Sequence, residues 1–146
     1  MKKVFHFDTP RANYESGAAV VWCFDRRFHL GFDKFLKRSG IVNPDVIKVA
    51  GGAKALASPE RESEREFVLD QIAKSIRLHG TKLVILMVHS DCGGYGGLAA
   101  FNGDAAAEAG HHRQELEKAA ECVRNAAPDV TVQGYFVDFE GVWSAD

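Results

Sequence analysis

Runs of apolar residues alternate along this chain with segments of helical periodicity. Four of the runs are rich in Val, Ile, Leu and Ala and predict strands at residues 17–23, 44–49, 82–88 and 130–137. Because these runs contain few polar residues that could face water, they are typical of strands buried on both faces. Such strands occur in parallel sheets that are covered by helices.

Three segments between the runs place apolar residues at helical spacing. We expect the first helix over residues 28–38 and the third over about 105–127. The second should open at the cap Ser58-Pro59 and end at His79-Gly80. The alternation predicts an α/β fold in a single domain, residues 1–146, with helices at the faces of a parallel sheet. We assume that the strands of this sheet have the order 2-1-3-4.

Two short polar stretches follow the first and the third predicted strands. Cys23 ends the first strand, with Asp25 and Arg27 just beyond it, and His89 and Cys92 come directly after the third. In the order 2-1-3-4 these strands are neighbours whose crossovers leave in opposite directions, so their carboxyl ends form the crevice where such folds bind ligands. Two thiols and one imidazole are the ligands of a zinc ion with one open position, which is typical of catalytic zinc.

The composition argues against several other classes of protein. With 46% apolar residues and a formal net charge of −2, we expect neither nucleic acid nor a membrane as partner. The longest apolar run, residues 83–88, is far too short to span a bilayer, and the first residues lack the apolar region of a signal peptide. Three cysteines, an odd number, argue against a disulfide framework. We therefore expect a cytoplasmic protein.

Each candidate residue also has a plainer structural interpretation. Cys23 could be a small core residue. Asp25 and Arg27 could be a cap and a surface ion pair of the helix that follows them. Asp91, between two candidate ligands, could bind the metal, although a solvated or supporting acid is the better interpretation. Cys122 lies off the apolar stripe of the third helix and is expected to be a partly exposed bystander.

Histidine is a common metal ligand, but the adjacent His111 and His112 lie at the start of a polar stretch of the third helix. We expect them to be solvated, although either could serve as a distant proton relay. His79 is expected only to end a helix.

The pattern Cys-x-Asp-x-Arg after one buried strand, with His-x-x-Cys-Gly after another, resembles the β-class carbonic anhydrases. Residues 49–52 are similar to the Ala-Gly loop of that family, and residues 133–138 to its last parallel strand. The resemblance spans about residues 17–142. The chain departs from the family at Lys48-Val49, where members usually have Arg-Asn, and at residues 94–97. It also has too few residues before the first strand for the helical arm of many members.

The resemblance implies a zinc lyase, a carbonate dehydratase that reversibly hydrates CO2 to bicarbonate and a proton. Cys23, His89 and Cys92 would bind one Zn2+ per chain, and hydroxide on the zinc would attack CO2. Asp25 would orient the hydroxide, or close the site by binding the metal itself, and Arg27 would hold Asp25. Backbone amides would steady the substrate or product at Gly51, Gly52, Gly93 and Gly94. The resemblance also implies a homodimer or a dimer-based oligomer.

Three other functions stay open at this level. The same zinc site could hydrolyse carbonyl sulfide or carbon disulfide, with a differently shaped pocket at the altered segments Lys48-Val49 and 94–97. The chain could instead be a zinc-binding regulatory domain without activity. A metal-free nucleophile, Cys92 activated by His89, is a weaker alternative because it leaves the Cys23-x-Asp-x-Arg27 pattern unexplained.

Overall fold

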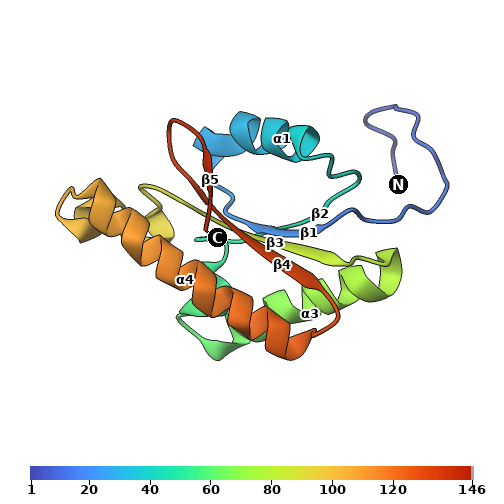
Figure 1. The fold of residues 1–146 in the computed structure, drawn as a ribbon. Coiled ribbons are helices and arrows are strands. Elements are labelled where there is room, and N and C mark those ends of the chain that lie inside the picture. Colours follow the sequence, from blue (N-terminus) through green and yellow to red (C-terminus); the bar gives the residue numbers. More distant parts are fainter. Residues whose placement is uncertain (146) are drawn as a thin grey trace.

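A computed structural model describes residues 1–145, which form a five-stranded sheet with the order β2-β1-β3-β4-β5 (Figure 1). Strands β1 to β4 are parallel, and β5 pairs with β4 in the antiparallel direction. The strands are β1 (Ala19–Trp22), β2 (Asp45–Lys48), β3 (Leu83–His89), β4 (Thr131–Val137) and β5 (Val142–Ser144). The expected order 2-1-3-4 is confirmed, and β5 is an additional strand that the pattern of apolar runs did not predict.

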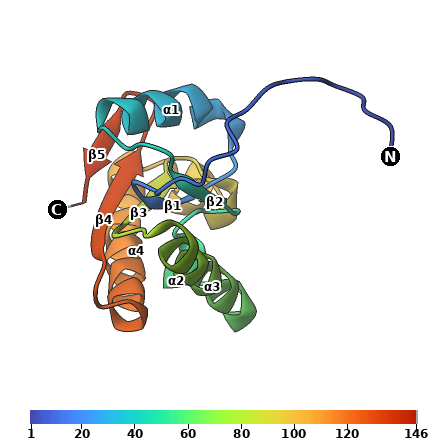
Figure 2. The same ribbon diagram turned by 90° about the vertical axis from the view of Figure 1, so that its right-hand side faces the viewer.

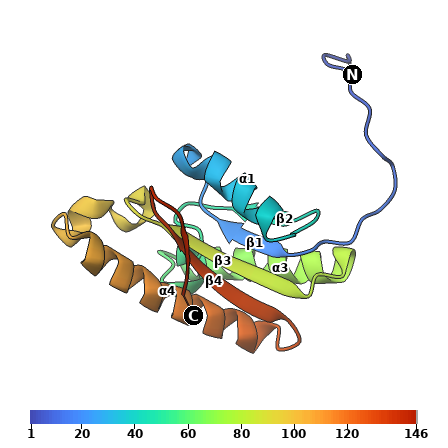
Figure 3. The same cartoon turned by 45° about the horizontal axis from the view of Figure 1, so that its top comes forward.

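Helices cover both faces of this sheet (Figures 1 and 2). Helix α1 (His29–Arg38) lies on one face, and α2 (Lys54–Ala57), α3 (Glu62–His79) and α4 (Ala105–Ala126) lie on the other. The expected α/β architecture is therefore confirmed. Residues 1–18 form neither helix nor strand, and the first part of this segment runs away from the sheet (Figure 3). Among residues 1–145, no helix combines the length and the apolar character needed to cross a membrane.

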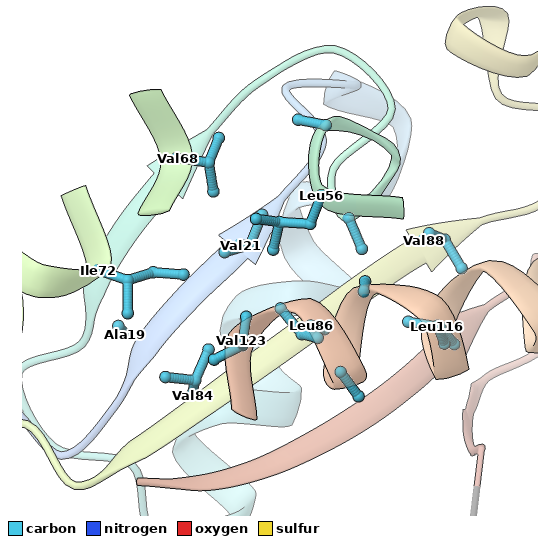
Figure 4. Close-up of a cluster of buried hydrophobic side chains, with 14 residues drawn as sticks. Ala19, Val21, Leu56, Val68, Ile72, Val84, Leu86, Val88, Leu116 and Val123 are labelled. Atoms are coloured by element: carbon cyan, nitrogen blue, oxygen red, sulfur yellow. The ribbon is translucent and has the colours of Figure 1, made fainter. Parts of the chain in front are cut away.

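Two separate cores explain why the central strands β1 and β3 are apolar at every position before His89. Alternate side chains of a strand point to opposite faces, so Val20 and Ile85 pack toward α1. Val21 and Leu86 pack toward the helices of the other face (Figure 4). Full burial of an aliphatic side chain of this size contributes about 1.5–3 kcal/mol. The edge strand β2 differs, because its residues alternate between half-buried and exposed, and here the expectation of burial on both faces is wrong.

Two helix starts differ from the sequence-based expectation. Helix α3 begins at Glu62 and not at Ser58-Pro59, because Ser58 ends the short helix α2 and donates its hydroxyl to Glu115 of α4. The first helix begins at His29 behind a turn of 3-10 helix, Arg26–Phe28. The end of α3 is as expected, because Gly80 closes it in the left-handed conformation with a φ of 66°.

Candidate metal centre

Cys23, His89 and Cys92 come together at the carboxyl ends of β1 and β3. One donor atom from each of the three side chains lies within 4.8 Å of the others, and the exposed fractions of the residues are 4%, 0% and 1%. The parallel pairing of Val21 with Leu86 brings the two strand ends level with each other, so ligands distant in the sequence become neighbours. The predicted convergence at this edge of the sheet is therefore confirmed.

The imidazole of His89 is arranged as that of a metal ligand. Its Nδ1 lies 2.9 Å from the carbonyl oxygen of Ser90, which fixes the proton on Nδ1 and leaves the lone pair on Nε2. Nε2 is buried and has no hydrogen-bond partner among residues 1–145. The rings of Trp22 and Phe28, with centroids 5.5 and 4.7 Å away, hold the imidazole in place. A metal ion would satisfy this buried nitrogen.

The two thiols behave as a coupled pair. The pKa of Cys23 is lowered, first by a hydrogen bond with Cys92, then by the neighbouring imidazole of His89, and further by the backbone of Asp25 and Gly51. The pKa of Cys92 is raised because Cys23 takes the negative charge and because the site is buried. A divalent cation removes this conflict, since it stabilises both thiolates at once. The donor set of two sulfurs and one imidazole nitrogen therefore fits a metal ion that prefers thiolate ligands.

Two glycine-containing loops meet beside the thiols. Gly51 and Gly52 follow β2 with φ angles of 74° and 58°, and Gly93 and Gly94 begin a 3-10 turn after β3. A Cβ atom on Gly52 would lie 2.3 Å from the carbonyl oxygen of Met87, and one on Gly94 would lie 3.0 Å from the Cα of Gly51. Close packing therefore accounts for glycine at positions 52 and 94. The assignment of the four glycines as substrate-binding residues stays a prediction.

The carboxylate of Asp25 is held beside the ligands by Arg27. The Nε of Arg27 donates to both carboxylate oxygens at 3.1 and 3.0 Å, Nη2 donates to Oδ2 at 2.6 Å, and the backbone N–H donates to Oδ1 at 2.9 Å. These hydrogen bonds from Arg27 lower the pKa of Asp25 to about 2. Oδ2 lies 3.9 Å from the Nε2 of His89. The expected two-pronged contact is present, and it places a charged carboxylate next to the metal donors.

Asp25 also caps the 3-10 turn that follows it, as the structural interpretation of this residue expected. The two interpretations are therefore compatible, because one carboxylate caps the turn, binds Arg27 and faces the ligand cluster.

Asp91 binds the other edge of the same guanidinium. Nη1 of Arg27 donates to Oδ2 of Asp91 at 2.8 Å, and Nη2 donates to its carbonyl oxygen at 2.9 Å. The backbone N–H of Asp91 donates in turn to Oε1 of Glu108 on α4 at 2.7 Å. The sequence suggested a supporting acid at position 91 from its place between two ligands. It gave no partner for Asp91 and did not indicate Glu108, which is 1% exposed.

His112 is buried, so the expectation of a solvated histidine at this position is wrong. It is 0% exposed and packs against the rings of Tyr95 and Phe136. Burial lowers the pKa of His112 to about 4, and among residues 1–145 neither ring nitrogen has a hydrogen-bond partner. The burial of His112 could have been predicted from its spacing, because residue 112 lies one turn before the buried Leu116 on the same face of α4. Its neighbour His111 is half-buried.

Cys122 is half-buried on α4 and lies outside the ligand cluster, as expected.

A comparison with family models places this geometry in a known group. A model described as "Putative carbonic anhydrase" matches residues 14–144. The chain belongs to this family. Among curated proteins, an uncharacterized protein of Rickettsia bellii (strain RML369-C) is 25% identical over 131 residues, which cover 88% of this chain and 80% of the relative.

Solved structures share the fold at low sequence identity. Tetrameric β-carbonic anhydrases from Sordaria macrospora are represented by a chain with a TM-score of 0.62 and 14% identity, covering 90% of this chain and 81% of that one. The apo form of a carbon disulfide hydrolase has a TM-score of 0.60 and 18% identity, covering 92% and 80%. The resemblance to β-class carbonic anhydrases that the sequence motifs indicated is confirmed at the level of family and fold.

Proposed function

We propose that this carbonic anhydrase family member catalyses the reversible, zinc-dependent hydration of CO2 to bicarbonate and a proton. One observation carries the proposal. A charged carboxylate, Asp25, is fixed by Arg27 with its Oδ2 3.9 Å from the Nε2 of His89, at the edge of a buried two-thiol, one-imidazole cluster. A purely structural metal site needs four protein ligands and no fixed acceptor beside them.

Zn2+ bound by Cys23, His89 and Cys92 would supply a nucleophile from water near neutral pH. Asp25 would accept a hydrogen bond from this nucleophile and direct its lone pair at the carbon of CO2. Because its pKa is about 2, Asp25 stays ionised at neutral pH and acts as a hydrogen-bond acceptor rather than as a store for the proton. Arg27 keeps the carboxylate charged and oriented.

The backbone amides near Gly93 and Gly94 are proposed to bind the anionic product. Gly93 is exposed, and a Cβ built on it meets no atom within 4 Å, so there is free space beside its Cα for a small ligand. Gly51 and Gly52 are proposed to shape the same pocket from the loop after β2. Close packing already requires glycine at position 52.

A second candidate activity uses the same metal centre. A carbon disulfide hydrolase shares the fold over 92% of this chain, which supports hydrolysis of carbon disulfide or carbonyl sulfide as the alternative. These molecules are linear like CO2 and need the same nucleophile, so the pocket would have to discriminate between them. A zinc-binding domain without activity is the remaining alternative.

Stopped-flow CO2 hydration by zinc-saturated protein between pH 7 and pH 9 tests the proposal. Asp25→Ala is compared with Asp33→Ala, which removes an exposed carboxylate of α1. We expect Asp25→Ala to lose most of the activity, by about 100-fold or more, because it removes a group that acts in the transition state. Asp33→Ala should retain the activity.

Absence of hydration at every pH, with one zinc bound per chain, would contradict the proposal. Hydrogen sulfide release from carbon disulfide by the same samples then separates the sulfur hydrolase from an inactive domain.

We further propose a homodimer or a dimer-based oligomer in the cytoplasm, with one Zn2+ per chain. The exposed aromatic side chains of Phe24, Phe67 and Phe139 support a surface near the site that a second subunit covers. The Sordaria macrospora enzymes are described as tetrameric. Free thiols at all three cysteines suit a reducing compartment. Sedimentation at micromolar concentration that shows only the 16 kDa species would contradict the oligomer.

A further inference from the structure

We propose that Asp91 is a positioning residue for the metal centre. By holding the guanidinium of Arg27, Asp91 keeps Asp25 bound to Arg27 and therefore keeps the fourth coordination position free for an external ligand. This inference rests on the proposed metal site and on the proposed place of Asp25 beside it.

The guanidinium of Arg27 is bound along two of its edges. The edge formed by Nε and Nη2 donates to Asp25, and the edge formed by Nη1 and Nη2 donates to the side chain and the carbonyl of Asp91. The Arg27 side chain is 45% exposed, and an ion pair that is so open to water is worth little by itself. The contacts with Asp91 hold the guanidinium from a second side, so its position does not depend on Asp25 alone.

Asp91 is itself held by rigid parts of the fold. Its Oδ1 accepts a hydrogen bond from the backbone N–H of Leu98 at 3.0 Å, and its own N–H donates to the buried Glu108 of α4. Its φ of 51° lies in the left-handed region, which places its backbone carbonyl and its carboxylate on the same guanidinium. The anchor of Arg27 is therefore built on β3 and α4, whereas Asp25 lies in the short connection after β1.

Asp25 is close enough to the ligand cluster to become a ligand itself. Its Oδ2 lies 3.9 Å from the Nε2 of His89, and four hydrogen bonds from Arg27 hold it back. Without Asp91, the guanidinium can turn into solvent and several of these bonds weaken together. Asp25 would then occupy the fourth position and compete with every external ligand.

Asp91→Asn is the most informative variant. Asparagine has the size of aspartate and tolerates the left-handed conformation. Its single oxygen, however, cannot accept from both Leu98 N and Arg27 Nη1, because its NH2 group faces one of these donors. Asp33→Asn, on the exposed face of α1, is the matched control for loss of one carboxylate charge.

The experiment titrates azide into the Co2+-loaded full-length protein at pH 7.5 and follows the visible absorption of the cobalt. We expect azide to bind Asp91→Asn about tenfold more weakly than wild type, which corresponds to about 1.4 kcal/mol. Asp33→Asn should match wild type. In an Asp25→Ala background, the substitution at position 91 should no longer weaken azide binding, because the competing carboxylate is gone.

Unchanged or tighter azide binding by Asp91→Asn would overturn the proposal, since it would show that Asp91 does not restrain Asp25. An equal loss in the Asp25→Ala background would also overturn it, because the effect would then not pass through Asp25. The readout is independent of turnover. If the cobalt protein gives the expected azide pattern but the zinc protein does not hydrate CO2, the positioning role stands and the proposed function fails.

Discussion

Replacement of the buried His112 by phenylalanine should make the protein more resistant to acid. The imidazole of His112 is 0% exposed and lies among aromatic rings, and burial lowers its pKa to about 4. Neither ring nitrogen of His112 has a hydrogen-bond partner in the described part of the chain. Phenylalanine fills a similar volume and carries no polar atom, so at neutral pH His112→Phe should leave stability unchanged or raise it by about 1 kcal/mol.

The pH dependence gives a sharper magnitude. In the unfolded chain, His112 takes up a proton near its ordinary pKa of 6.5, whereas in the folded protein it does so only at about 4. Below pH 6.5 the unfolded state therefore binds more protons than the folded state. The free energy of unfolding is not affected by this difference above pH 6.5, and it falls as the pH is lowered from 6.5 to about 4. At about 1.4 kcal/mol per pKa unit, the loss is about 3 kcal/mol.

Urea denaturation of wild type and His112→Phe between pH 7.5 and pH 4 measures this loss. All samples contain a chelator, because release of a metal at low pH would add its own pH dependence. The advantage of His112→Phe in the free energy of unfolding should grow by about 3 kcal/mol across this range. Val123→Ala, which removes buried apolar volume from the same helix, should shift the free energy by a constant amount at every pH.

A constant difference between His112→Phe and wild type at every pH would refute this reasoning. It would mean that folded His112 accepts a proton at its ordinary pKa. The nearest candidate partner for a protonated ring is Glu108, whose Oε1 lies 3.8 Å from Nε2.

Three further substitutions have definite expected outcomes. Cys92→Ser should abolish stoichiometric zinc binding in metal analysis while Cys122→Ser retains it, and equal zinc in both would contradict the ligand set. Gly52→Ala should lower the free energy of unfolding by more than about 2 kcal/mol in urea, because its φ is 58° and the new Cβ would lie 2.3 Å from the oxygen of Met87. Asp104→Ala removes the cap of α4 and should cost about 1 kcal/mol in the same assay, whereas Asp104→Asn should cost less, and equal losses would count against the cap.

The sequence by itself determined the α/β class and the three candidate ligands, and the strand order that was assumed for this class agrees with the structure. Each of these depends on patterns that are local in the chain or on a general rule of topology. Apolar runs marked the strands, and the rule that ligands gather where crossovers diverge placed Cys23 beside His89 and Cys92.

The short elements could not be predicted from the apolar pattern. Strand β5 has only three residues and exists because β4 offers it a hydrogen-bonding edge. Helix α2 has four residues, and Ser58 lies at its end. The sequence had placed Ser58 at the start of a helix. For elements this short, pairing and packing outweigh local propensity.

The side-chain contacts around the metal centre were decided only by the tertiary structure. Arg27 binds both Asp25 and Asp91, and Glu108 reaches the backbone of Asp91 from a helix later in the chain. His112 is buried because its face of α4 packs against the ring of Phe136 on β4. A sequence states which groups are available, but the partners of a polar group depend on distances and directions between elements, and these are set only when the layers pack together.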